Sequence, residues 1–214
     1  MCGIAGLIHR GKSSNVGEEL QHMLQALKHR GPDSTGYALY ANNDGQNFIL
    51  RFKVGENVGE GSTSVNEDES VYNERKKIVD KKLSELGALV VKEEKLTPYS
   101  YRYEIKFDKD LMDFSKAIES IPSVEILSIG KSLELIKDLG DATVVSERYG
   151  LNKVQGTHGI GHARMATESG VDIKSAHPFW GYPFADVSVV HNGQLTNYWN
   201  NRRVLENKGM RFMS

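Results

Sequence analysis

Apolar residues recur with strand-like and helix-like periodicity in the N-terminal part of the chain. Residues 3–8 (GIAGLI) form a short, uninterrupted apolar run, which is typical of a buried strand. The segment 17–29 predicts a helix with one apolar face, because its apolar residues are spaced by three and four. Those residues are Leu20, Met23, Leu24 and Leu27. The sequence Gly31-Pro32-Asp33 is expected to end this helix, and the chain then returns as a strand over 35–41.

The region 47–140 alternates between strand-like and helix-like patterns. We expect its elements in the order β-α-β-β-α-β, which is that of a ferredoxin-like unit. The segments are 47–54, 71–86, 88–94, 101–107, 110–120 and 124–130. The polar, Gly/Ser-rich stretch 55–70 predicts a linker or loop, and residues 131–140 predict a short helix that Gly140 ends. The pattern therefore predicts an α+β module, 47–140, inserted into a domain formed by 1–46 and 141–214.

The pattern changes again after residue 154, where glycine and small residues become frequent. Residues 186–193 (DVSVVHNG) read as an apolar strand that runs into a polar turn, and 197–209 predict a helix. We find no internal repeat and no low-complexity tract.

Charge and cysteine content narrow the classes of partner. The 214 residues include 27 basic and 28 acidic side chains, and the net charge is −1. This balance gives no support for a nucleic-acid or membrane partner. No apolar run approaches the roughly 18 residues of a membrane span, and the N-terminus lacks signal-peptide features. A single cysteine excludes an internal disulfide and a Cys-rich zinc site, so a cytoplasmic location is expected.

That single cysteine is Cys2, directly behind the initiator methionine. A lone cysteine is usually a small buried hydrophobic residue. Removal of Met1, however, would give Cys2 a free α-amine with a reference pKa of about 7.7–8.0, so part of it is neutral at pH 7. That amine could serve as the base for the thiol of its own residue, as in an N-terminal nucleophile.

Three further stretches carry candidate chemistry, namely HRGPDSTGYA (29–38), GHARMATESG (161–170) followed by AHPF (176–179), and VVHNGQLTN (189–197). A cysteine that attacks an amide needs donors for the developing oxyanion, and Asn192 and Gly193 would supply a side-chain amide and a backbone N–H. Arg164 could bind a substrate carboxylate through two parallel hydrogen bonds. The alternatives are an ordinary turn for the HNG sequence and a surface ion pair for Arg164.

Four histidines near these stretches raise the question of a metal site. Their spacing matches no zinc pattern, and no metal is expected. They are His158, His162, His177 and His191.

Taken together, MCGIAG, HRGPDSTG, GHARMAT and HNGQLTN resemble, in this order, the class II glutamine amidotransferases, whose glutaminase domains are N-terminal-nucleophile hydrolases. The resemblance covers about 1–42 and 155–214. The long insertion looks most like the stand-alone amidotransferase subunits of archaeal-type glutamate synthases and their N-methylglutamate synthase relatives. The resemblance implies a four-layer αββα sandwich.

In this family, the thiolate of the residue that matches Cys2 attacks the side-chain amide of glutamine after Met1 is removed. Asn192 and Gly193 would stabilise the oxyanion, and a γ-glutamyl thioester would form on Cys2 before water releases glutamate. Ammonia would pass to a separate synthase subunit. The resemblance implies no cofactor in this chain and a flavin-dependent synthase as partner.

The family resemblance also assigns substrate-binding residues. Arg164 matches the arginine that binds the α-carboxylate of glutamine, and Thr167 lies in the same loop. Arg30 matches a supporting arginine near the nucleophile. His177, which precedes Pro178, is expected to join this set as a supporting hydrogen bonder.

One family feature does not occur in the sequence. The aspartate that binds the α-amine of glutamine would follow the last residue, Ser214, and neither Asp172 nor Asp186 matches its position. We therefore expect the sequence to be an N-terminal part of a longer protein. Two alternatives remain: a catalytically incomplete binding or regulatory module, and another N-terminal-nucleophile enzyme such as an asparagine synthetase, which shares HRGPD.

Overall fold

The computed structural model describes residues 2–42, 45–55, 68–165, 173–210 and 212. Its helices are α1 (Val16–Ala26), α2 (Glu69–Leu86), α3 (Leu111–Glu119), α4 (Ala142–Tyr149), α5 (Tyr198–Glu206) and the 3₁₀ turns η1 (Lys28–Arg30) and η2 (Leu151–Lys153). Its strands are β1 (Gly3–Ile8), β2 (Ser34–Ala41), β3 (Phe48–Lys53), β4 (Leu89–Thr97), β5 (Ser100–Lys106), β6 (Glu125–Gly130), β7 (Leu133–Leu139), β8 (Gly156–Arg164), β9 (Phe179–Trp180) and β10 (Ser188–Val189). No helix in these ranges is long and apolar enough to cross a bilayer.

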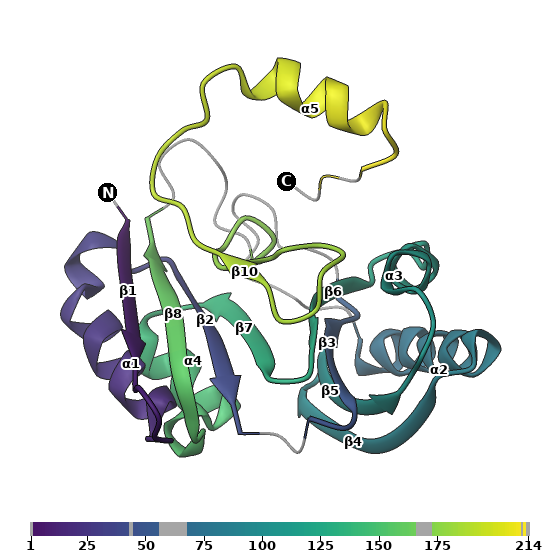
Figure 1. The fold of residues 1–214 in the computed structure, drawn as a ribbon, viewed down its shortest axis with the longest axis horizontal. Helices are drawn as coiled ribbons and strands as arrows, with labels where there is room; N and C mark the ends of the chain where they lie inside the picture. The colour runs from purple at the N-terminus through teal and green to yellow at the C-terminus, as the bar shows by residue number, and fades with distance from the viewer. Residues whose placement is uncertain (1, 43–44, 56–67, 166–172, 211, 213–214) are drawn as a thin grey trace.

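The first sheet has the strand order β1-β8-β2-β7, and every neighbouring pair is antiparallel. Helices α1 and α4 pack on one face of it (Figure 1). The leucine spacing of α1 has the expected result, because Leu20 and Leu24 are fully buried against this sheet. Asp141 begins α4 by accepting hydrogen bonds from two main-chain N–H groups, and Gly150 ends the helix in a left-handed conformation.

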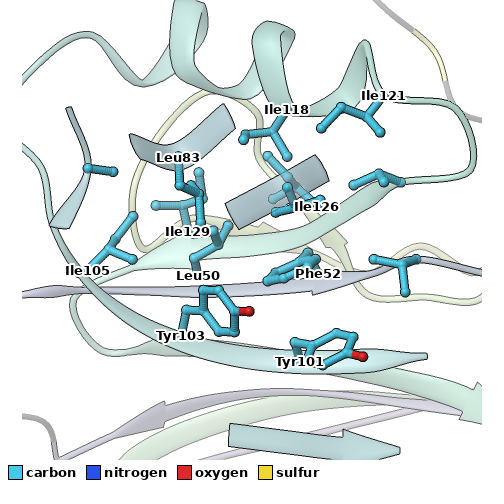
Figure 2. Close-up of a cluster of buried hydrophobic side chains, with 14 of the residues drawn as sticks. Leu50, Phe52, Leu83, Tyr101, Tyr103, Ile105, Ile118, Ile121, Ile126 and Ile129 are labelled. Carbon is cyan, nitrogen blue, oxygen red and sulfur yellow. The ribbon is translucent and has the colours of Figure 1, made fainter. Parts of the chain in front are cut away.

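The second sheet has the order β4-β5-β3-β6 and is also antiparallel. Helices α2 and α3 pack on one face of it and bury an apolar core (Figure 2). Leu83 of α2 and Ile118 of α3 meet Leu50 and Phe52 of the central strand β3 in this core. Both sheets therefore follow the usual rule that a sheet with one apolar face is covered by helices.

A seam of charged residues connects the two sheets along β7, in which all members are buried except the partly buried Arg102. The seam consists of Arg51, Lys53, Arg102, Glu125, Glu134 and Lys137. Glu134 of β7 accepts hydrogen bonds from Arg51 of β3 and Arg102 of β5, and in each the arginine Nε lies 2.9 Å from Glu134 Oε2. Burial alone would raise the pKa of Glu134, but the two guanidinium groups hold it at about 2. Removing one member of such a buried ion-pair network destabilises the fold, because an uncompensated charge then stays buried.

Most of the predicted elements are confirmed, including the order β-α-β-β-α-β from β3 to β6. Within the described residues, two four-stranded antiparallel sheets and five α-helices form an α+β architecture consistent with an N-terminal-nucleophile sandwich. The full four-layer arrangement, the inserted module and its bounds stay predictions. Most of the stretch 55–70 lies outside the described residues.

The predicted helix over 131–140 is wrong. Residues Leu133–Leu139 form β7, which pairs with β2 along its whole length and joins the first sheet. The apolar residues of LELIKDL are compatible with either period, and burial on both faces removes the alternation that identifies a strand. The predicted strand over 186–193 shortens to Ser188–Val189, while α4 and β8 were not predicted.

Candidate active site

Cys2 lies directly before β1 at the edge of the first sheet and is half-buried. Its Sγ is 3.5 Å from the main-chain nitrogen of Met165 and 3.7 Å from the Met165 carbonyl oxygen. The antiparallel register Gly3↔Ala163 places Cys2 and Arg164 at the same end of the neighbouring strands β1 and β8. Two candidate residues far apart in the sequence are thus brought together by strand pairing.

The HRGPD segment packs against this end of β8. The Nε of Arg30 donates a hydrogen bond to the Cys2 carbonyl oxygen at 3.3 Å, so Arg30 lies beside the candidate nucleophile. Asp33 donates its main-chain N–H to the Arg164 carbonyl at 3.1 Å. Gly31 permits this close approach, because a Cβ atom there would lie 2.3 Å from the Ala163 carbonyl oxygen.

Arg164 is the last residue of β8, and its side chain is buried, with 6% of the residue exposed. It pairs in register with Ser34 at the start of β2. A guanidinium held at the end of a strand next to the nucleophile suits fixed, two-point binding of a carboxylate. Thr167, the other residue predicted in this stretch, lies outside the described residues.

The HNG sequence follows β10 and returns to the nucleophile. The Nδ2 of Asn192 donates a hydrogen bond to the Cys2 carbonyl oxygen at 3.0 Å, across 190 residues of sequence. Gly193 has a φ of 154°, a conformation that side chains disfavour. We call residues His191–Gly193 the oxyanion loop, because the sequence predicts oxyanion donors at Asn192 and Gly193; all three residues are exposed.

His177 is hydrogen-bonded to the main chain of this loop. Its Nδ1 accepts a hydrogen bond from the main-chain N–H of His191 at 3.2 Å, and its ring stacks on that of His162 with centroids 4.8 Å apart. Burial is the main cause that lowers the pKa of His177 to about 3 and that of His162 to about 4. Both imidazoles are therefore neutral near pH 7. The substrate-binding role predicted for His177 stays a prediction. In the structure its Nδ1 accepts a hydrogen bond from the oxyanion loop.

The remaining histidine of this part of the chain, His158, stacks on Tyr40 with ring centroids 3.9 Å apart. Among the described residues, no group of three or more His, Cys, Asp or Glu side chains is arranged to hold a metal ion. The site as described is built from a thiol, two arginines and an amide.

Sequence reasoning gave no place in the site to two buried residues, His162 and Lys137. His162 stood out only as a possible metal ligand, although its alternation with buried Arg164 in GHARMAT indicates an inward-facing side chain. Lys137 fell in the segment interpreted as a helix, and its contacts cross between elements that local patterns do not connect.

No protein-family model matches the chain. It is 37% identical over 214 residues to a protein of Methanothermobacter thermautotrophicus named "Putative glutamine amidotransferase", covering 98% of this chain and 66% of that protein. It is 32% identical over 218 residues to "Glutamine amidotransferase-like protein GlxB" of Rhizobium meliloti, covering 99% and 65%. An amidophosphoribosyltransferase of Methanocaldococcus jannaschii matches over 88 residues, 41% of this chain and 19% of that enzyme, with 36% identity.

The chain thus spans about two thirds of the length of the first two relatives. Both alignments cover almost all of this sequence. By this homology, the chain contains a class II glutamine amidotransferase domain.

Proposed function

We propose that this domain hydrolyses the side-chain amide of glutamine with Cys2 as nucleophile and delivers the ammonia to a synthase. The observation that carries the proposal is the hydrogen bond between the Asn192 amide and the Cys2 carbonyl. Together with the pairing of β1 and β8, it puts the Asn192 amide, the thiol and the buried Arg164 at one end of the first sheet, which supports the proposal. Fixed donors near a nucleophile are the feature that acyl transfer requires.

The proposed reaction starts once Met1 has been removed. The α-amine of Cys2 accepts the thiol proton, and Sγ attacks the amide carbon of glutamine. The Asn192 amide has two N–H groups, and one of them is bound to the Cys2 carbonyl. The other can donate to the oxyanion together with the Gly193 N–H. The carbon–nitrogen bond breaks, ammonia leaves with a proton from the α-ammonium group, and a γ-glutamyl thioester remains until water hydrolyses it to glutamate.

In this proposal, Arg164 and Arg30 orient the substrate and the nucleophile. Arg164 would bind the α-carboxylate of glutamine, with Thr167 contributing from the same loop, and Arg30 would hold the Cys2 main chain in place. Holding the amide at attack distance supplies much of the rate enhancement expected of such a site.

The released ammonia needs an acceptor. We propose a separate synthase subunit of the glutamate synthase type, carrying flavin, with the unit from β3 to β6 as an inserted ferredoxin-like module. The strand order β4-β5-β3-β6 and the two helices on one face support the ferredoxin-like interpretation. The family resemblance supports the synthase partner.

The test combines mass and kinetics. The intact mass of the purified protein would be measured before and after incubation with 6-diazo-5-oxo-norleucine, a glutamine analogue that traps such cysteines, and ammonia release from glutamine would be followed. Loss of Met1, one adduct on Cys2 and activity that Cys2→Ser abolishes are expected. A processed N-terminus with neither adduct nor ammonia release would refute the glutaminase and favour a binding or regulatory module.

A further inference from the structure

The oxyanion loop is an extension of a two-stranded ribbon. In this ribbon β9 and β10 are antiparallel, with Val189 opposite Phe179 and Ser188 opposite Trp180. Continuing the same register two residues further places His191 opposite His177, where the two are joined by the Nδ1 hydrogen bond. The position of the loop therefore depends on where β9 lies.

Two anchors hold the ribbon against β7 and the turn that precedes it. At its far end, the Asp186 carboxylate accepts main-chain N–H groups of Lys131, Ser132 and Leu133 in the turn between β6 and β7. At the end near the active site, the ammonium of Lys137 lies 4.8 Å from the centroid of the Phe179 ring. An ammonium over an aromatic face within about 6 Å is attractive, most of all when both groups are shielded from water.

Lys137 is itself held in a defined position. It is 3% exposed, and its Nζ donates to the carbonyl of Lys174 at 3.1 Å and pairs with Glu125 of β6 at 3.3 Å. Glu125 also pairs with Lys53 of β3 at 2.9 Å. Burial alone would raise the pKa of Glu125, but the two lysines lower it, so the carboxylate stays charged. The buried ammonium thus joins the seam between the sheets to the segments that flank the active site.

We propose that Lys137 is a positioning residue for the oxyanion loop, acting through Phe179 and His177. The Phe179 ring lies against the His177 ring with centroids 4.5 Å apart in an edge-on arrangement, and His177 binds the main chain of His191. Asn192 follows and reaches Cys2. The contacts of Lys137 described above are with Glu125, the Lys174 carbonyl and Phe179, so the effect we assign to it is on geometry. The inference rests on the proposed glutaminase function.

The kinetic test uses Lys137→Met, which keeps most of the side-chain volume and removes the charge. We expect kcat for glutamine hydrolysis to fall about 10- to 100-fold with KM changed less than about threefold, because displaced oxyanion donors act on the transition state. Alkylation of Cys2 by iodoacetamide, which needs no oxyanion donor, should keep its rate. The matched control is Arg51→Met, which removes a buried cation of the same seam whose hydrogen bonds go to Glu134.

A second variant, Phe179→Leu, breaks the same connection without removing a charge. It should lower kcat in the same way, and the double variant with Lys137→Met should be no slower than the worse single variant, since both act through one contact. Unchanged kcat in Lys137→Met, an equal loss in Arg51→Met, or full additivity with Phe179→Leu would each overturn the inference.

Hydrogen exchange at the His191 amide separates this inference from the proposed function. Lys137→Met should accelerate exchange of that amide at least several-fold, and Arg51→Met should not, whether or not the protein hydrolyses glutamine. An inactive wild-type protein with this exchange pattern would refute the glutaminase and retain the positioning role. A wild-type protein that hydrolyses glutamine, combined with unchanged exchange at His191 in Lys137→Met, would support the glutaminase and refute the positioning role.

Discussion

Replacing Glu134 by glutamine tests whether the buried seam stabilises the fold electrostatically. The wild-type carboxylate has a pKa of about 2, against an ordinary value of 4.5, because Arg51 and Arg102 outweigh the cost of its burial. The unfolded chain therefore binds a proton at Glu134 more readily than the folded one does. This contribution to stability is complete above the unfolded pKa of 4.5 and is lost as the pH falls toward 2.

The size of the effect follows from the same two values. A lowering from 4.5 to about 2 corresponds to about 3 kcal/mol of stability above pH 6. The same linkage relation leaves less than half of this contribution at pH 3. A loss of about 3–5 kcal/mol is also what is expected when one partner of a buried ion pair is removed. Glutamine resembles the protonated carboxyl group, so the gap between Glu134→Gln and wild type should narrow as the pH falls.

The assay is urea unfolding of both proteins, followed by circular dichroism at several pH values from 7 to 3. Glu85→Gln is the matched control, because Glu85 is half-exposed and pairs only at the surface of α2 with lysines such as Lys82. It should follow the wild-type curve closely. A stability difference for Glu134→Gln that is small at pH 7, or that stays constant down to pH 3, would refute the electrostatic reasoning.

Three further predictions concern the surroundings of the site. Gly36→Ala would place a Cβ atom 2.0 Å from the His177 carbonyl oxygen, so it should cost about 1–3 kcal/mol or more in urea unfolding, whereas Gly55→Ala, with its nearest contact at 3.4 Å, should not. Asp186→Asn should cost about 1–3 kcal/mol at pH 7 by weakening bonds to three main-chain N–H groups. Those bonds lower the pKa of Asp186 despite its burial, so the loss should shrink as the pH falls below 4; a constant loss would contradict this. NMR of the imidazole rings should show His162 and His177 neutral down to about pH 5, since burial lowers their pKa values to about 4 and about 3; midpoints near 6.5 would contradict that burial.

Secondary structure was most readily predicted where an element has one apolar face and one face in water, although α4 was not predicted. The helix that became α1 has a clear apolar stripe, and its buried residues Leu20 and Leu24 belong to it. The strand β7 has no such contrast, because six of its seven residues are buried, among them Glu134, Lys137 and Asp138. A charged residue in a sequence normally indicates solvent, but Glu134 and Lys137 form ion pairs with the second sheet, and Asp138 pairs with Arg148 of α4.

The candidate site shows the same division. Cys2, Arg164 and the HNG sequence could be found from residue types and their order, and strand pairing brings them together. The role of Lys137 could not be found in that way. Its partners are Glu125, Phe179 and the Lys174 carbonyl, and only the packing of β7 against β6 and the ribbon makes them neighbours.

The sequence by itself determined the chemistry that this protein can bring to a site and most of its helices and strands. Reactive groups are properties of single residues, and periodicity is a property of neighbouring ones, so both can be read locally. Only the tertiary structure decided that β7 is a strand with buried charges and that the oxyanion loop rests on His177 and, through Phe179, on Lys137. These features depend on contacts between residues distant in the chain, where the low dielectric of the interior makes each ion pair strong and each unpaired charge costly.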